Sequence, residues 1–245
     1  MWHNIQMGTF HLYFEYSVRG TSDLDRLVKM CQYAVDLSSG HLEKIDLYRF
    51  GTDDLLQYIA DRASNLRSIQ LDSCIRVSDE GLCEVAKKFP LLEEISISHG
   101  FQFKKCIEVI GLSCPLLKSL KFNGSGGYIV SDDEALIIAK TMPGLRHLDI
   151  HGNRPLSDVG LIAILDGCPL LESLDIRGCS NLDFSGNLWK RLHNQIKDLK
   201  IKDEYSNNFK LEFAYSDSNG NTYWEIVERS SDEDEDEDDN EDYGA

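Results

Sequence analysis

Two histidines and an aspartate occupy alternate positions at His147, Asp149 and His151. Side chains of these types can bind a metal ion or transfer a proton. If the segment is a strand, side chains two positions apart stand about 6.6 Å from one another, and the two histidines about twice that far. This spacing is too wide for one shared ion or proton, and no Ser/His/Asp or Cys/His grouping accompanies it. We therefore expect no metal site, no cofactor and no enzymatic activity.

Cysteine is the other residue type here that could do chemistry. The seven cysteines form no C-x-x-C pair and no Cys/His grouping at zinc spacing. Their odd number and scatter favour a reducing compartment, so we expect the chain in the cytoplasm, the nucleus or both. Cys114 and Cys168 each precede a proline, whereas Cys74 and Cys179 occupy a predicted turn. These recurrences predict buried structural thiols.

A repeat supplies the elements that would position these side chains. The pattern L-x-x-L-x-L recurs at intervals of 24 to 28 residues, within the 20–29 residues typical of leucine-rich repeats. Its copies are Leu42-Ile45-Leu47, Leu66-Ile69-Leu71, Leu92-Ile95-Ile97, Leu117-Leu120-Phe122, Leu145-Leu148-Ile150, Leu171-Leu174-Ile176 and Ile196-Leu199-Ile201. The repeat predicts an α/β leucine-rich-repeat solenoid, a horseshoe with about seven parallel strands on the concave face and helices on the convex face.

The rest of each unit fits this architecture. A serine followed by an aspartate precedes three predicted helices, at Ser78, Ser131 and Ser157, and serine there is a favoured helix N-cap. Proline comes just before the next strand at Pro90, Pro115, Pro143 and Pro169, where it ends the helix. A small polar residue in the turn, such as Cys74 or Asn153, can hydrogen-bond the backbone of the neighbouring turn.

Side chains at alternate strand positions should form three lateral rows on the concave face, with neighbours about 5 Å apart. We predict a patch in these rows that binds a partner protein, made of Lys121, Asn123, His147, Asp149, His151, Asp175, Arg177 and Lys200. Sideways ion pairs are expected between Lys121 and Asp149 and between Asp175 and Lys200. The alternative left open is a solvated face with lateral ion pairs.

The charge of the chain is concentrated at its C-terminal end. The formal net charge is −17, and the ten acids among residues 232–242 account for all but −7 of it. An acidic chain lacks the basic footprint that nucleic acids and anionic membranes require, so we expect neither as a partner. Residues 230–245 are predicted to be a disordered acidic tail. The pattern of residues 204–229 predicts a hairpin that caps the last repeat. The alternative is a linker that carries a short aromatic binding motif.

Particular segments resemble a known family. Residues 114–120 and 168–174 read C-P-L-L-x-S-L, and residues 78–82 and 157–161 read S-D-x-G-L. These motifs resemble the cysteine-containing class of leucine-rich repeats, which is typical of the F-box/leucine-rich-repeat proteins. Residues 30–36 and 50–61 look like the plant branch of that family. The resemblance covers about residues 22–203 and implies a substrate-recognition component of Skp–cullin–F-box ubiquitin ligases, with a protein substrate on the concave face.

The N-terminal segment departs from the family pattern. Residues 1–7 resemble the segment just after an F-box, and residues 1–21 are interpreted as a remnant of it. The F-box helices, which dock the Skp adaptor in this family, are missing from the chain, so adaptor binding is doubtful. The alternative function is a free-standing leucine-rich-repeat binding module without ligase association, either a truncated paralogue or a nuclear histone-binding protein with an acidic tail.

Overall fold

The computed structural model describes residues 2–7, 21–98, 104–123, 130–183, 186–201, 209–216 and 222–228. The chain divides into two units, Met1–Ile201 and Lys202–Ala245. All of the L-x-x-L-x-L copies lie in the first unit. All eight residues of the predicted concave patch therefore lie in the first unit.

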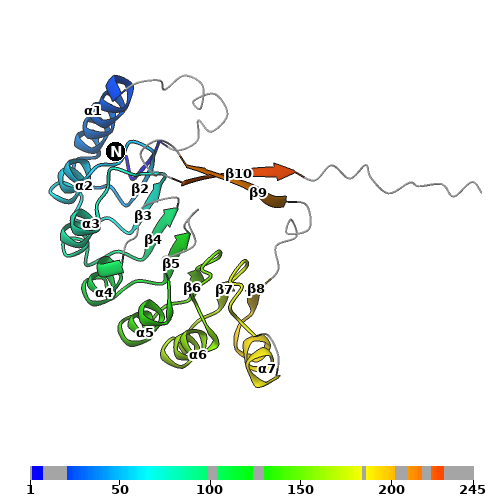
Figure 1. The fold of residues 1–245 in the computed structure, drawn as a ribbon. Helices are drawn as coiled ribbons and strands as arrows, with labels where there is room; N and C mark the ends of the chain where they lie inside the picture. Colours follow the sequence, from blue (N-terminus) through cyan, green and yellow to red (C-terminus); the bar gives the residue numbers. More distant parts are fainter. Residues whose placement is uncertain are drawn as a thin grey trace, which may run out of the picture. The chain divides into compact units, whose positions relative to one another are not determined.

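One parallel sheet runs through the described part of the first unit, with its strands in chain order (Figure 1). The strands are β1 (Asn4–Met7), β2 (Lys44–Tyr48), β3 (Ser68–Asp72), β4 (Glu94–Ser98), β5 (Ser119–Asn123), β6 (His147–Asp149), β7 (Ser173–Asp175) and β8 (Asp198–Lys200). Because each strand pairs in parallel with the next along the chain, a crossover must return the chain after every strand. The leucine-rich-repeat solenoid expected from the sequence is confirmed.

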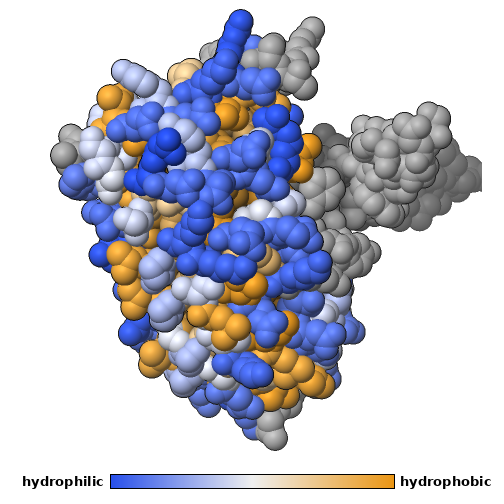
Figure 2. Space-filling model, turned by 90° about the vertical axis from the view of Figure 1, so that its left-hand side faces the viewer, coloured by the Kyte–Doolittle hydropathy of each residue, from blue (hydrophilic) through white to orange (hydrophobic). Residues whose placement is uncertain are grey.

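Helices cover the outer side of the curved sheet (Figure 1). They are α1 (Thr21–Ser38), α2 (Asp53–Ala60), α3 (Asp79–Ala86), α4 (Lys104–Ser113), α5 (Asp132–Thr141), α6 (Asp158–Gly167) and α7 (Gly186–Gln195). Apolar side chains are scattered among hydrophilic ones on this helical side (Figure 2). Among the residues described, no helix is both long enough and apolar enough to span a bilayer.

The first strand was not expected. We assigned residues 1–21 to a segment outside the repeats and began the repeat domain at residue 22, with about seven strands. The structure pairs β1 with β2, so that Ile5 lies beside Ile45 and Met7 beside Leu47. The sequence signal was present, because Trp2, Ile5 and Met7 follow the L-x-x-L-x-L spacing with tryptophan in the first position. The sheet therefore begins within the N-terminal segment.

The apolar positions of the pattern stack into continuous rows. Ile45 pairs with Ile69, which pairs with Ile95, and the row continues along the sheet. Leu42, Ile45 and Leu47 are all fully buried. One strand with its helix could not bury its own apolar face, so the core forms between successive repeats.

Hydrogen bonds between successive repeats also join the helices. The Asp53 carboxylate accepts hydrogen bonds from the backbone N–H of Ser78 (2.8 Å) and from its hydroxyl (2.7 Å), one repeat further on. The Asp79 carboxylate accepts from the N–H groups of Lys105 and Cys106 in the same way. In both cases the aspartate after the N-cap accepts hydrogen bonds from N–H groups at the start of the next helix, which no intrahelical bond would satisfy.

This contact explains the glycine of the S-D-x-G-L motif. A Cβ at Gly81 would stand 2.1 Å from Oδ1 of Asp53. Glycine to alanine normally stabilises a helix by about 1 kcal/mol. We expect Gly81→Ala instead to lower the free energy of unfolding by about 1–2 kcal/mol, because it displaces a hydrogen-bonded carboxylate.

Urea denaturation followed by circular dichroism measures this effect. Gly144→Ala is the matched control, since the nearest atom to its added Cβ is the Leu117 carbonyl oxygen at 3.8 Å, an ordinary contact. We expect that control to be near neutral. A stabilised Gly81→Ala variant would refute the proposed packing of Asp53 over the helix start.

The second unit contains a two-stranded antiparallel sheet. β9 (Phe209–Ser216) pairs with β10 (Thr222–Glu228), with Thr222 opposite Ser216 and an irregularity between Glu225 and Ile226. Both strands fall within residues 204–229, for which the sequence suggested a hairpin. The capping role stays a prediction, and the acidic tail at 230–245 lies outside the described residues.

Candidate functional site on the concave face

The strand register places the concave rows as the sequence predicted. In the central row Lys121 pairs with Asp149, Asp149 with Asp175, and Asp175 with Lys200. His147 pairs with Ser173 in the row before it. The exposed residues of the patch include His147 and Lys200, whereas Asp175 is buried. The patch therefore combines exposed groups with a buried charge.

Asp149 is the centre of a hydrogen-bonded cluster. Its carboxylate contacts Nδ1 of His151 at 2.8 Å and Nζ of Lys121 at 3.3 Å. The side-chain amide of Asn123 donates to it at 3.3 Å, and Asn123 is itself buried. The predicted sideways pair of Lys121 with Asp149 is confirmed. Three neighbouring side chains thus hold one carboxylate in place.

Asp175 is the second carboxylate of the patch, and it pairs with Arg177 where the sequence predicted Lys200. Arg177 donates from Nε (2.9 Å) and from a terminal nitrogen (2.7 Å) to the two carboxylate oxygens. In the part of the chain that the structure describes, this ion pair with Arg177 replaces the expected Asp175–Lys200 pair. The planar guanidinium fork matches a carboxylate, which a lysine ammonium cannot do.

The spacing argument against a shared ligand set was wrong for His151. It assumed that His151 continues the strand, but β6 ends at Asp149 and His151 lies in the following turn. The turn brings the imidazole back to the carboxylate, and ligand atoms of Asp149, His151 and Asp175 lie within 4.8 Å of one another. That distance is compatible with a metal ion. However, Lys121 and Arg177 already balance the two carboxylates, so the group has no excess negative charge to attract a cation.

The charges around Asp149 shift its titration. Burial alone would raise the pKa of Asp149, but the hydrogen bond from His151 and the charges of His151 and Lys121 outweigh it and lower the pKa to about 2. A carboxyl whose folded-state pKa is depressed stabilises the fold above its unfolded pKa of 3.8. The contribution is lost as pH falls through the folded value.

Asp149→Asn should therefore have a pH-dependent effect. Above about pH 5 we expect the substitution to lower the free energy of unfolding by about 2 kcal/mol, because the depressed pKa is worth about 1.4 kcal/mol per unit. The difference between variant and wild type should shrink as the pH approaches about 2, where the wild-type carboxyl is protonated too. Urea denaturation over this pH range measures it. A difference that stays constant with pH would contradict the proposed role of the charged carboxylate.

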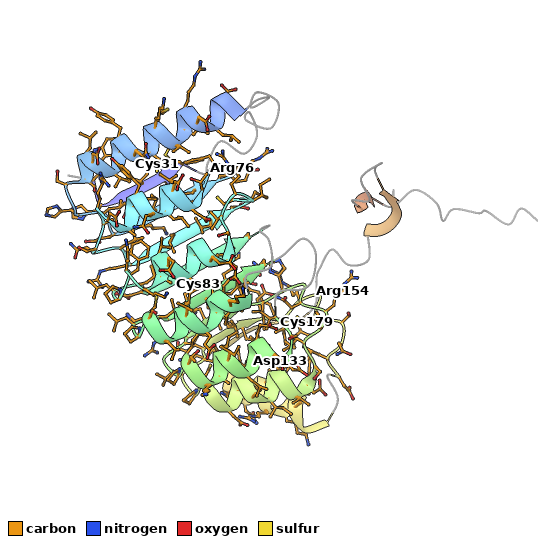
Figure 3. All side chains as sticks on the ribbon, turned by 60° about the vertical axis from the view of Figure 1, so that its left-hand side comes forward. Cys31, Arg76, Cys83, Asp133, Arg154 and Cys179 are labelled. Atoms are coloured by element: carbon orange, nitrogen blue, oxygen red, sulfur yellow. The ribbon has the colours of Figure 1, made fainter. Side chains whose placement is uncertain are left out.

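Cys74 and Cys179 lie in the turns after β3 and β7, Cys114 and Cys168 lie just after α4 and α6, and all four are buried, as the sequence predicted. The Cys74 thiol lies 3.4 Å from the Leu47 carbonyl, and the Cys179 thiol 3.4 Å from the Ile150 carbonyl, each in the preceding repeat. Burial raises the pKa of Cys74 and of Cys168 to about 11, which makes them poor nucleophiles. Cys83, on α3 in the outer layer, is only half-buried (Figure 3).

A lateral row of charges escaped the sequence analysis. The residue after the first apolar position of each repeat is charged, and the row reads Glu43, Arg67, Glu93, Lys118, Arg146, Glu172 and Lys197. Lys118 and Arg67 both pair with Glu93 and hold its pKa below the usual range. The available signal was a charged residue at this position in every repeat, with both signs present along the row. Exposed pairs of this kind stabilise a fold by about 0–1 kcal/mol each, so the row is a minor part of the stack.

The chain matches no protein-family model, but it is similar to several plant proteins. It is 46% identical over 182 residues to Putative F-box/LRR-repeat protein 23 of Arabidopsis thaliana, across 73% of this chain and 40% of that protein. It is 43% identical over 198 residues to F-box protein SKIP19 of the same plant, across 80% of this chain and 62% of that one. The chain is a homologue of the plant F-box/leucine-rich-repeat proteins. The resemblance seen in the sequence is confirmed.

The similarity is partial in length. The chain spans about half the length of the Arabidopsis relatives that it matches. Among solved structures it resembles a chain in the crystal structure of the yeast Rad7–Elc1 complex, with a TM-score of 0.57 and 17% identity. The match covers 71% of this chain and 45% of that chain. At this identity the likeness shows the fold, and it supports the leucine-rich-repeat architecture of this F-box/leucine-rich-repeat homologue.

Proposed function

We propose that this chain is the protein-recognition part of a ubiquitin-ligase substrate receptor and binds its protein partner on the concave face. The observation that carries the proposal is the cluster around Asp149 and Asp175, where side chains of the strands and of the turns after them hold each other in fixed positions. Preorganised polar groups on a rigid sheet give an interface specificity, because little side-chain freedom is lost on binding. The similarity to plant F-box/leucine-rich-repeat proteins supports the ligase context.

The concave face suits a protein better than a metabolite. Its strands lie side by side at about 4.8 Å spacing, so the inner surface extends over roughly 30 Å. Most of the patch is charged, whereas the helical side has dispersed exposed apolar residues such as Leu136 and Ile162. Scattered single apolar residues are normal on a protein surface and need no partner. The concave patch is therefore the better candidate for recognition.

The ligase role can be separated from binding with two proteins. One is the chain as it stands, and the other carries an F-box module fused before Met1. We expect both to capture the same partner from plant extract, and the fused form alone to bring the Skp adaptor with it. In a reconstituted ligase the partner bound to the fused form should receive ubiquitin.

Two outcomes would contradict parts of this proposal. A captured partner that receives no ubiquitin would reject the substrate-receptor role and leave a free-standing binding module, which is the alternative function. Capture that is unchanged by substitutions at His147 and Lys200, both exposed in the patch, would reject binding through this part of the concave face.

A further inference from the structure

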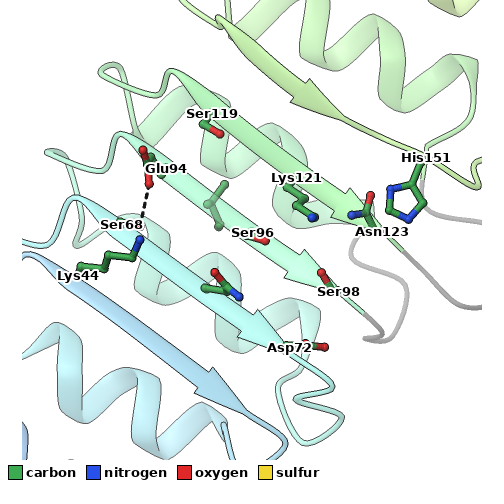
Figure 4. Close-up of a pocket in the computed structure, with 12 residues that line it drawn as sticks. Lys44, Ser68, Asp72, Glu94, Ser96, Ser98, Ser119, Lys121, Asn123 and His151 are labelled. Carbon is green, nitrogen blue, oxygen red and sulfur yellow. Dashed lines mark hydrogen bonds between the residues drawn. The ribbon is translucent and has the colours of Figure 1, made fainter. Parts of the chain in front are cut away.

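A hollow lies on the concave face over β3, β4 and β5, and its lining includes three residues of the predicted patch, Lys121, Asn123 and His151 (Figure 4). It encloses about 400 Å³. Its lining includes short side chains, among them Ser96 and Ser98 on β4 and Ser119 on β5, and longer ones such as Lys44 and Lys121. Because a strand surface is otherwise flat, this contrast in side-chain length creates the concavity.

The hydrogen-bonding groups in the hollow are largely unengaged. Within the part of the chain that the structure describes, the hydroxyls of Ser96, Ser98 and Ser119 and the amide of Gln70 make no side-chain hydrogen bond. The Ser68 hydroxyl, in contrast, donates to Glu94 at 3.1 Å. All four unengaged side chains are half-buried. Water can bond them in the free protein, and a partner that covers them must supply replacement hydrogen bonds.

The charges around the hollow cancel. Its lining includes two lysines and two acids, namely Lys44, Lys121, Asp72 and Glu94. Their formal charges sum to zero, and Glu94 also accepts the hydrogen bond from Ser68. A charged occupant would therefore gain little attraction here. An apolar occupant would strip water from the hydroxyls and leave them without partners.

We infer that the hollow receives an uncharged, hydrogen-bonding stretch of an extended polypeptide, rich in serine, threonine, asparagine, glutamine or glycine. This inference rests on the proposed binding of protein at the concave face and adds the chemistry of the bound segment. A serine hydroxyl both donates and accepts a hydrogen bond, as does the Gln70 amide, so the lining can meet the N–H and C=O groups of a peptide backbone. Recognition thus divides between the hollow on β3–β5, whose lining carries no net charge, and the rest of the patch between His147 and Lys200.

Random peptides displayed on phage provide the probe. The full chain is the bait, and the selected peptides are compared for composition and for their affinity to variants. We expect runs of uncharged polar residues to be enriched. Ser96→Trp, which fills the hollow, should weaken the selected peptides by about tenfold or more. Leu136→Trp, at an exposed position on the convex helix α5, is the control and should leave their affinity unchanged.

A finer substitution separates hydrogen bonding from shape. The double variant Ser96→Ala, Ser98→Ala enlarges the hollow slightly but removes two hydroxyls. We expect it to weaken the peptides by about threefold to tenfold, as the loss of one or two neutral hydrogen bonds would. An unchanged affinity would overturn the hydrogen-bonding role. Thermal melting of each variant confirms that the fold is retained.

The remaining outcomes distinguish this inference from the proposed function. Charged or apolar peptides that Ser96→Trp displaces would overturn the chemistry assigned to the hollow. Peptides lost with Lys200→Glu and unaffected by Ser96→Trp would overturn the hollow as a site and leave concave binding intact. Selected peptides that respond to none of these concave substitutions, or no selected peptides at all, would count against both.

Discussion

Replacing Asp132 by alanine should lower the free energy of unfolding by about 3 kcal/mol, since it removes several charge-assisted hydrogen bonds. The Asp132 carboxylate accepts from the N–H (2.8 Å) and hydroxyl (2.5 Å) of Ser157 and from the N–H of Gly160 (3.2 Å). Burial alone would raise the pKa of Asp132, but these bonds outweigh it and the pKa is lowered. The substitution leaves the start of α6 without its partner in the preceding repeat.

Asp133→Ala is the matched control, because Asp133 is also in the first turn of α5 but is exposed. Both substitutions remove an acid from the same helix start and should lose the same small helix-dipole contribution, about 0.3–1 kcal/mol. Chemical denaturation of the two variants measures the difference. Equal destabilisation would show that the bonds from α5 to α6 contribute nothing beyond the dipole. Destabilisation at Asp132 alone identifies the inter-repeat bonds as its cause.

Replacing Lys121 by glutamate should weaken binding of the protein partner by about thirtyfold or more, the size of effect typical of a residue central to an interface. Lys121 belongs to the patch, also lines the hollow, and pairs with Asp149. The new carboxylate would repel Asp149 and disturb both regions at once. Titration calorimetry with the partner captured by the chain measures the affinity.

Lys118→Glu is the control for this variant. Lys118 comes from the same repeat and also makes an ion pair, with Glu93, but it belongs to the lateral charged row and not to the concave rows. We expect the affinity of the Lys118→Glu variant for the partner to remain within about threefold of wild type. An equal loss for the two variants would mean that net charge, and not the concave surface, governs binding.

The repeat made much of this fold predictable. The period and the buried positions follow from a chain in which every unit must share its core with its neighbours. Strand register follows too, since equivalent positions in successive repeats lie side by side, as Lys121 and Asp149 do. The same logic placed Cys74 and Cys179 in turns, and in the structure their thiols contact carbonyls of the preceding repeat. These features depend on regularity, which a sequence displays directly.

The parts that could not be predicted depend on local departures from that regularity. His151 contacts Asp149 because the strand stops there, and the apolar pattern does not reveal where a strand ends. Asp175 binds Arg177 of its own repeat because a long arginine can fold back, which row spacing alone cannot anticipate. The hollow at Ser96 arises from unequal side-chain lengths across three strands. These local features become visible only when the side chains of neighbouring strands and turns are placed next to one another.

Site-specific photo-crosslinking in plant extract tests most directly the claim that the concave face binds the partner. A photoreactive benzophenone amino acid replaces His147 or Ser96 on the concave face, or Leu136 on the convex helix α5, where it is 50% exposed. We predict a covalent adduct with the same partner from positions 147 and 96 and none from position 136. An adduct from position 136, with none from the other two, would contradict the claim.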